Sequence, residues 1–350
     1  MFWKGIGPSS PRWIGGDPSA EDSPHNIQMG NRKSRTRRCS LGPIRRRSTI
    51  TASLLRWYRR NSRDLPWRGE RDPYRILVSE VMLQQTQVGR VLAKYPLFLS
   101  RFPSFQKLAR AKSSSVIKAW QGMGYNGRAV RLWRLARTLM LDGGGKLPGD
   151  TRALQKLPGI GLYTASALAC FTFGKQVAVV DTNVSRVLYR LFPASVRRRT
   201  VSRNETIRRG DLWDAAASLL PKGRAKQWNQ ALMDLGSTIC TARAPKCGAC
   251  PVQAHCPSAH QINRTRADQR KREPAREGIP NRIYRGRIVE ALRNLNGTSS
   301  IGQHQLAVSI KPNYRRGDRK WFRQILVDLE RDGLVRLART TTGLRVSLPD

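Results

Sequence analysis

The chain has 350 residues, of which 65 are Lys or Arg and 23 are Asp or Glu, so its formal net charge at pH 7 is +42. A charge of this size repels itself unless a polyanion is bound, which indicates a nucleic-acid partner over a merely soluble basic protein. No run of about 18 or more apolar residues occurs, so a transmembrane helix is excluded. The length allows two domains and a tail, and 39% apolar residues suffice for a core.

The N-terminal stretch, residues 1–47, is rich in Gly, Pro, Ser and Arg, and residues 32–47 contain no acid. We expect a disordered basic arm that adds non-specific affinity for DNA. The same stretch fits an organelle transit peptide or a start codon placed too early. It lacks the compact apolar core of a signal peptide.

Helical periodicity begins with the apolar residues of 50–58 and resumes after the segment L-P-W-R at 65–68. Asp72 and Pro73 suit the cap and first turn of a helix whose body we place over 74–87. Its apolar residues lie nearly all round, so the helix is expected to be buried, and Glu80 lies on its inner stripe. A carboxyl there is either paired with a cation or has a raised pKa suited to general acid catalysis.

Further helices are expected over 89–101, 104–110, 114–121 and 127–141. The segment G-M-G-Y-N-G-R-A at 122–129 separates the last two. Its glycines allow a close approach of the backbone to a ligand, and its one aromatic residue, Tyr125, can stack on bases or wedge between them. Most loops of this composition are only turns.

Residues 150–183 predict a helix–turn–helix hairpin that ends in a buried apolar run. Asp150 can cap the first helix, which Pro158 ends, and Gly159 and Gly161 form a tight reversal. The turn L-P-G-I-G exposes backbone N–H groups at the start of a helix, which can bind a phosphate oxygen without reading sequence. An ordinary structural hairpin is the alternative.

Asp181 follows the apolar run 177–180 and starts the next predicted helix. Its simplest role is that of an N-cap. A basic loop over 197–209 and two helices, about 211–220 and 224–238, lead to four cysteines. Cys240, Cys247, Cys250 and Cys256 have the spacing C-x6-C-x2-C-x5-C, and clustering of this kind in a large chain without a signal peptide indicates metal rather than disulfides.

Four thiolates can hold zinc, but zinc sites more often pair two C-x2-C knuckles, and only one occurs here. The compact, uneven loop favours one [4Fe-4S] cluster with four thiolate ligands. His255 adjoins the last cysteine and is surplus to a set of four. Cys39 and Cys170 are unrelated to the loop.

Residues 259–280 read as a polar, charged linker, and order resumes in residues 281–350. Helices are expected over about 283–295, 303–308 and 318–332, the last with a basic start, followed by a hairpin around T-T-T-G. Three helices and a hairpin are the order of a winged helix, whose third helix is the candidate to face DNA. A helical protein-interaction domain is the alternative.

The order of these motifs resembles the helix-hairpin-helix DNA glycosylase superfamily, in its branch with an iron–sulfur loop. L-P-W-R, S-E-V-M-L-Q-Q-T-Q-V and the 122–129 loop resemble the MutY adenine DNA glycosylases in particular. The resemblance covers about residues 48–258 and implies a mainly α, two-lobed helix-hairpin-helix glycosylase fold with the cluster loop at 240–256. A small winged-helix-like domain would follow.

The resemblance implies roles for matching positions. Glu80 would protonate the adenine leaving group, and Asp181 would stabilise the oxocarbenium ion of the sugar or bond to it transiently. Asn183 matches a polar residue near that aspartate, and Tyr163 a residue over the flipped nucleotide. The residues expected to enter the duplex and support base flipping are Gln84, Gln85 and Tyr125.

Cleavage of an N-glycosidic bond needs a proton donor at the base and an anion beside the sugar, and the base must first leave the stack. In the related endonuclease III branch a Lys at the position of Tyr163 attacks the sugar as a Schiff-base nucleophile. A tyrosine cannot do so, and a monofunctional enzyme that leaves an abasic site is expected.

The C-terminal part departs from the family, whose members typically end in a nudix-like domain that recognises 8-oxoguanine; no match to that domain's Phe-Ser-His loop is found. The leading expectation is removal of adenine opposite 8-oxoguanine or guanine from double-stranded DNA, by a monomer with no membrane partner. If the source is bacterial, it would act in the cytoplasm at the nucleoid. The alternatives are a G·T mismatch thymine (or uracil) glycosylase and a non-catalytic, cluster-bearing DNA-binding protein.

Overall fold

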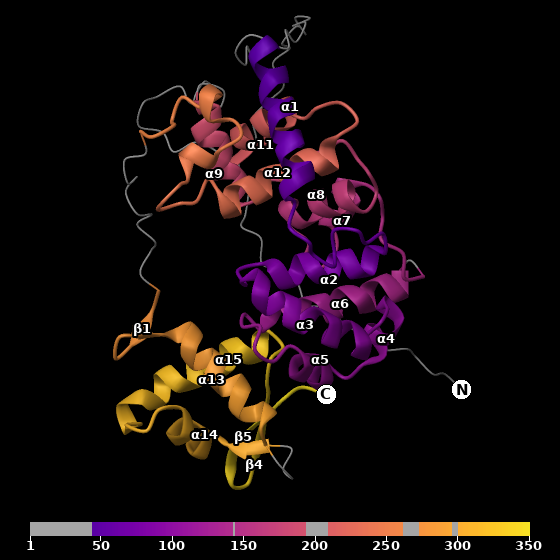
Figure 1. Cartoon of the computed structure of the whole chain (residues 1–350). Helices are drawn as coiled ribbons and strands as arrows, with labels where there is room; N and C mark the ends of the chain where they lie inside the picture. Colours follow the sequence, from indigo (N-terminus) through magenta and orange to yellow (C-terminus); the bar gives the residue numbers. More distant parts are fainter. Residues whose placement is uncertain (1–43, 143, 194–208, 262–272, 296–299) are drawn as a thin grey trace, which may run out of the picture. The chain divides into compact units, whose positions relative to one another are not determined.

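The computed structural model describes residues 44–142, 144–193, 209–261, 273–295 and 300–350 (Figure 1). The predicted basic arm lies outside the described residues except for 44–47, which belong to the first helix, α1. The predicted basic loop at 197–209 also lies outside them, apart from its last residue. Among the described helices none is long and apolar enough to cross a membrane.

One lobe consists of consecutive helices around a buried core that includes Leu77, Val78, Trp120 and Leu168. The chain enters it through α2, on which α3, α6 and α8 pack. Most helices of this lobe begin and end within two residues of the predicted bounds. They are α2 (Pro73–Leu83), α3 (Val88–Arg101), α4 (Phe105–Arg110), α5 (Ser113–Ala119), α6 (Gly127–Asp142), α7 (Thr151–Gln155) and α8 (Leu162–Phe171).

The second lobe joins the two ends of the glycosylase-like region. Its helices are α1 (Ile44–Asn61), α9 (Thr182–Leu191), α11 (Arg209–Ser218) and α12 (Ala225–Thr238). Helix α1 lies against α12 although about 170 residues separate them, and α12 also packs on α9 (Figure 1). The core of this lobe includes Leu54, Leu188 and Trp228. The chain therefore crosses from one lobe to the other before α2 and again before α9.

Three aspartates cap helices where the sequence predicts it. The Asp72 carboxylate accepts a hydrogen bond from the N–H of Tyr74, and Pro73 takes the first turn of α2. The Asp150 carboxylate accepts from the N–H of Ala153 at the start of α7. Asp181 caps α9 in the same way. Because each cap satisfies a free N–H of a first turn, the starts of these helices are set locally by the sequence.

The C-terminal elements run in the order α13 (Asn281–Arg293), β3 (Ser300–Gly302), α14 (Gln303–Ile310), η3 (Arg316–Asp318), α15 (Arg319–Arg331), β4 (Arg336–Thr340) and β5 (Gly343–Ser347). The three strands form one antiparallel sheet in the order β3-β5-β4. Tyr284, Phe322 and Leu326 lie in its core. The helices and the β4–β5 hairpin match the expectation, whereas the short β3 is an addition.

The segment predicted to be a linker differs from the expectation in its last residues. The last part of the expected linker forms a hairpin of β1 (Ala275–Arg276) and β2 (Ile279–Pro280). The hydroxyl of Tyr284 donates to the carbonyl oxygen of Arg276, so this hairpin packs with the C-terminal elements. The segment lacks apolar periodicity because its strands are two residues long, which explains why it reads as linker.

The C-terminal elements contact the first lobe at α5 and at the loop that follows it. The Arg293 guanidinium donates to the carbonyl oxygen of Ile117 at 2.8 and 3.1 Å and to Oδ1 of Asn126 at 2.8 Å. The N–H of Ser114 donates to the carbonyl oxygen of Pro349 at 3.0 Å. The side chain of Arg293 is only 4% exposed, so these bonds are shielded from water.

Candidate active site

A cleft of about 1030 Å³ holds all nine of the predicted catalytic and DNA-contacting residues. Both lobes contribute to its walls, through α2 and α8 on one side and α9 and α12 on the other. The walls also include the L-P-W-R segment. The nine residues are Glu80, Gln84, Gln85, Tyr125, Gly159, Gly161, Tyr163, Asp181 and Asn183.

Glu80 is a buried carboxyl without a cation partner. It is 6% exposed, on the buried helix α2, and its Oε2 atom has no hydrogen-bond partner. Burial raises the pKa of Glu80 to about 7; the negative charge of Asp181 also raises it, while a hydrogen bond from Tyr163 acts in the opposite direction. A carboxyl with this pKa is close to half protonated at neutral pH and can donate a proton.

Asp181 lies at the point where the apolar run 177–180 ends and α9 begins. Its Oδ1 accepts from the N–H of Val184 at 2.6 Å, and its Oδ2 accepts from Nδ2 of Asn183 at 3.1 Å. Each carboxylate oxygen therefore has one N–H donor, which fixes the orientation of the group. The carboxylate lines the cleft as well as capping the helix, so the two roles are compatible.

Tyr163 lies in the first turn of α8, directly after L-P-G-I-G. Its hydroxyl is hydrogen-bonded to the Glu80 carboxyl, and burial together with the charge of Glu80 raises the pKa of Tyr163 well above its ordinary value. The phenol therefore stays protonated and acts as a hydrogen-bond donor in the cleft. It has no amine with which to form a Schiff base.

The hairpin turn brings backbone to the cleft. Gly159 has φ +78°, and a Cβ there would meet the Cβ of Arg131 at 2.9 Å, so this position needs glycine. Gly161 is the N-cap of α8, with open space around its Cα. The N–H groups of the first turn of α8 thus lie at the cleft wall, as an anion-binding helix start requires.

Gln84 and Gln85 lie past the end of α2, which corrects the prediction that the helix continues to residue 87. The helix ends at Leu83, and Gln85 adopts a left-handed φ of 55°. Tyr125 likewise has a left-handed φ of 43°, in a loop whose Gly122 and Gly124 also have positive φ. Such backbone is unfavourable for residues with a Cβ and persists only where the surroundings hold it.

Arg128 holds both of these segments. It is 3% exposed, and its guanidinium donates to the carbonyl oxygens of Val81, Met82 and Gln84 on one side and of Met123 and Gly124 on the other. It also donates to Oγ1 of Thr86. Its planar fork lies over the rings of Trp120 and Tyr125. One side chain therefore fixes the two segments that are expected to enter the duplex.

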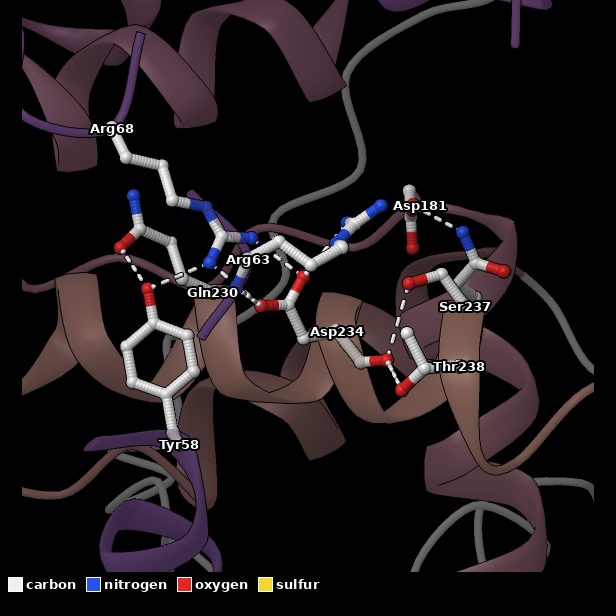
Figure 2. A network of polar contacts seen from close by, with 9 residues as sticks. Tyr58, Arg63, Arg68, Asp181, Gln230, Asp234, Ser237 and Thr238 are labelled. Atoms are coloured by element: carbon white, nitrogen blue, oxygen red, sulfur yellow. Dashed lines mark hydrogen bonds and ion pairs between the residues drawn. The ribbon is translucent and has the colours of Figure 1, made fainter. Parts of the chain in front are cut away.

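A second buried carboxylate, Asp234, was not predicted. Its side chain is 0% exposed and forms ion pairs with Arg63 at 2.7 Å and Arg68 at 2.5 Å (Figure 2). Arg68 also donates to the Tyr58 hydroxyl, which in turn donates to Oε1 of Gln230 at 2.8 Å. Arg63, Arg68 and Gln230 line the cleft, so Asp234 orders one of its polar walls.

Only part of this wall had a signal in the sequence. L-P-W-R was recognised as a motif, and it supplies Trp67 and Arg68. Gln230 and Asp234 lie on the amphipathic helix α12, where a polar residue at helical spacing is typical of a solvent-facing side. Their contacts with residues of α1 and the following segment, more than 160 positions earlier, carry no local pattern.

The four cysteines lie on the loop that follows α12, through the 3-10 turns η1 (Cys247–Ala249) and η2 (Gln253–His255). The other three thiols lie close enough to Cys250 to influence its charge. Four cysteine thiolates on one short loop are a suitable ligand set for a [4Fe-4S] cluster, and these four residues would hold it.

Two arginines of α9 join the cysteine loop to the cleft. Arg186 donates to Oδ1 of Asn183 at 2.8 Å and to the carbonyl oxygen of Cys240 at 2.8 Å. Arg190 donates to the carbonyl oxygen of Thr241 at 2.6 Å, and its Nη1 lies 3.3 Å from Sγ of Cys240. The loop is thereby fixed to the helix that Asp181 starts.

Comparison with known proteins places this site in a family. The profile of the HhH-GPD superfamily base excision DNA repair proteins matches residues 78–209, and that of the iron-sulfur binding domain of endonuclease III matches residues 240–256. The chain is 41% identical to an adenine DNA glycosylase of Mycobacterium tuberculosis, over 69% of this chain and 77% of that protein. The chain belongs to the HhH-GPD superfamily. The predicted fold and iron–sulfur cluster are thereby confirmed.

Two further relatives share the two-lobed region. A thymine/uracil-DNA glycosylase of Methanothermobacter thermautotrophicus is 35% identical, over 61% of this chain and 94% of that protein. The structure of a thermostable thymine-DNA glycosylase superposes with a TM-score of 0.57 at 34% identity, covering 62% of this chain and 98% of that one. The resemblance to MutY-type enzymes is borne out by the adenine DNA glycosylases among the relatives. The protein is a DNA glycosylase.

Proposed function

We propose that this glycosylase removes adenine mispaired with 8-oxoguanine or guanine and leaves an abasic site without cutting the strand. The observation that carries the proposal is the pair of unlike carboxyl groups in one cleft. Glu80 is buried, lacks a cation partner and has a pKa of about 7, whereas Asp181 is fixed by two N–H donors. Environments that differ in this way separate an acid from an anion.

In the proposed reaction the adenine leaves the stack and enters the cleft, and Glu80 donates its proton to a ring nitrogen. The N-glycosidic bond then breaks, and its electron pair leaves with the base. The positive charge that develops on the sugar is stabilised by the Asp181 carboxylate. Water adds to the anomeric carbon and gives a proton to the Glu80 carboxylate, which regenerates the acid and leaves a hydroxyl on the abasic sugar.

The roles of the other residues follow from their positions around this reaction. Tyr163 donates to Glu80 and orients it. Gln84, Gln85 and Tyr125 occupy the gap left by the extruded nucleotide, and the N–H groups after Gly159 and Gly161 bind the backbone phosphate. Cys240, Cys247, Cys250 and Cys256 would hold the [4Fe-4S] cluster, which supplies a rigid support for a basic loop.

Adenine is favoured over thymine by two observations. The segment S-E-V-M-L-Q-Q-T-Q resembles the MutY enzymes, and most of the similar proteins are named adenine DNA glycosylase, including one from Homo sapiens at 40% identity. The thymine/uracil-DNA glycosylase at 35% identity keeps thymine or uracil opposite guanine as the second candidate. We further propose that the enzyme acts as a monomer on double-stranded DNA, at the nucleoid of a bacterial cytoplasm.

One assay separates the candidates. Purified enzyme is incubated with duplexes that carry A·8-oxoG, A·G, T·G or U·G, and abasic sites are then cleaved with alkali. Release of adenine alone supports the proposal, and release of thymine or uracil without adenine overturns it. No release from any duplex would favour a DNA-binding protein without catalysis.

The monofunctional character has its own readout. Without alkali or heat the strand should stay intact, and borohydride should trap no covalent complex with DNA, because Tyr163 offers no amine. Strand cleavage by the protein alone, together with a borohydride-trapped complex, would contradict this part of the proposal.

A further inference from the structure

The C-terminal region carries more cations than its own acids can neutralise. Residues 281–350 contain 14 Lys or Arg and 6 Asp or Glu. Most of the acidic residues form ion pairs with nearby Lys or Arg side chains. Asp318, which is 3% exposed, pairs with Arg276 at 2.6 Å and Lys311 at 3.2 Å. Further acids pair with Arg285, Arg293, Arg331 and Arg336.

The cations without an acidic partner are not spread evenly. Five of them fall within nine residues, at the turn before α15 and along its first half: Arg315, Arg316, Arg319, Lys320 and Arg323. All five side chains are exposed, and among the described residues none forms an ion pair. We call these five residues the α15 basic patch.

Packing explains why the patch faces outward. The opposite side of α15 carries Phe322, Ile325, Leu326 and Leu329, all buried in the C-terminal core. That apolar stripe fixes the rotation of the helix, so Arg319 and Arg323, one turn apart, lie on the exposed side. The second half of the helix differs, because Asp328 and Glu330 balance Arg331 there.

We propose that the α15 basic patch is a second DNA-binding site, which contacts backbone phosphates of the duplex outside the lesion. Five exposed, unpaired cations within nine residues repel one another unless they meet a polyanion. Double-stranded DNA carries a charge about every 1.7 Å along its axis, so a helix face of this kind can meet several phosphates at once. Contacts of this type position the protein and do not read sequence.

The junction with the first lobe links this site to the same duplex. Arg293 of α13 donates to Asn126, the residue after Tyr125, and to Ile117 at the end of α5. The C-terminal elements are thus bonded to the loop that is proposed to enter the duplex at the lesion. In this proposal the patch binds further phosphates of the duplex that occupies the cleft. This second contact is separate from the proposed excision chemistry.

The test compares two triple variants of the full-length protein with equal loss of charge. The patch variant is R319Q/K320Q/R323Q, and the control is R282Q/R331Q/R336Q, whose arginines pair with carboxylates in the same region. We measure affinity for a lesion-free duplex over a range of salt concentrations. The duplex has about 40 base pairs, which is long enough for a contact on either side of the cleft. Thermal unfolding verifies that both variants are folded.

The patch variant should bind at least about tenfold more weakly, and the slope of log affinity against log salt should fall by about 3, or about one for each cation removed from a phosphate. The control should change affinity by less than about threefold. Single-turnover excision at saturating enzyme should match the wild type, which separates failure of this proposal from failure of the proposed function. Equal slopes for both variants would overturn the second DNA site and leave a protein-interaction surface.

Discussion

Two buried carboxyl groups of this enzyme have opposite surroundings. Asp234 is paired with Arg63 and Arg68 and is fully satisfied, whereas Glu80 has no cation and leaves its Oε2 without a partner. The first arrangement fixes two segments of the chain to α12. The second makes the charged form costly and keeps a proton available. Their surroundings alone thus distinguish a structural carboxyl from the one that is proposed to be catalytic.

We expect the largest change in activity at Glu80, the proposed general acid. Glu80→Gln keeps the size of the side chain but removes its transferable proton. We expect the single-turnover excision rate to fall by about 10²- to 10⁴-fold, with affinity for lesion DNA unchanged within a few-fold. A fall of less than about tenfold at neutral pH would show that another group supplies the proton.

Asp234→Asn removes the negative charge that pairs with Arg63 and Arg68. It leaves Arg63 and Arg68 without their anion in a largely buried place, so the free energy of unfolding should fall by about 3 kcal/mol. Urea denaturation measures this loss. Glu70→Gln provides the control, because Glu70 pairs with the half-exposed Arg75 and should cost no more than about 1 kcal/mol. Equal losses in the two variants would show that the buried ion pairs of Asp234 stabilise the fold no more than a surface pair does.

The raised pKa of Glu80 predicts how stability depends on pH. The pKa of Glu80 is about 7 in the folded protein and 4.5 in the ordinary, solvated state, so the folded state binds this proton more tightly. Its contribution to stability is therefore present below about pH 4.5 and is lost as pH rises to about 7. Glu80→Gln should be more stable than the wild type by about 2–3 kcal/mol at pH 8, and the difference should vanish near pH 4.

The difference between wild type and variant is the quantity to measure, since the other titrating groups are common to both. Urea denaturation at pH 4, 6 and 8 covers the window. A difference that stays constant with pH would mean that the pKa of Glu80 is not raised by folding. If Glu80→Gln is more stable and less active than the wild type, Glu80 lowers stability at neutral pH while it supports activity.

We expect a smaller change in activity at Tyr163, which is hydrogen-bonded to Glu80. Its hydrogen bond favours the charged form of Glu80, and Tyr163→Phe removes it, so the pKa of Glu80 should rise further. The excision rate should fall above about pH 7 in the wild type, where Glu80 loses its proton. In the variant this limb of the pH profile should move to higher pH. A limb that does not move would show that Tyr163 leaves the proton of Glu80 untouched.

The sequence predicted the parts of the site that have a local pattern. The caps at Asp72, Asp150 and Asp181, the hairpin turn and the cysteine spacing are each specified within about twenty residues. Glu80 was expected to be buried because the apolar residues of α2 surround it. The end of α2 at Leu83 was missed, because Gln84 and Gln85 have ordinary helix propensity, and the contacts of Gln84 with Arg128 and Thr164 are long-range.

Long-range polar contacts account for the rest. Asp234 contacts Arg68 and Gln230 contacts Tyr58, and more than 160 residues separate the members of each pair. No periodicity in the sequence predicts such contacts. Strand β3 was missed for a similar reason, because three residues acquire strand geometry only by pairing with β5 at the other end of the C-terminal region. Tertiary context, and not propensity, decides these elements.

Arg128 has a mechanical consequence for the roles proposed for Gln84, Gln85 and Tyr125. The same guanidinium is bonded to the backbone at Gln84 and at Gly124, so the two segments proposed to enter the duplex are held to each other. We therefore expect the two segments to enter and leave DNA together, and a base pair that resists one of them should resist both.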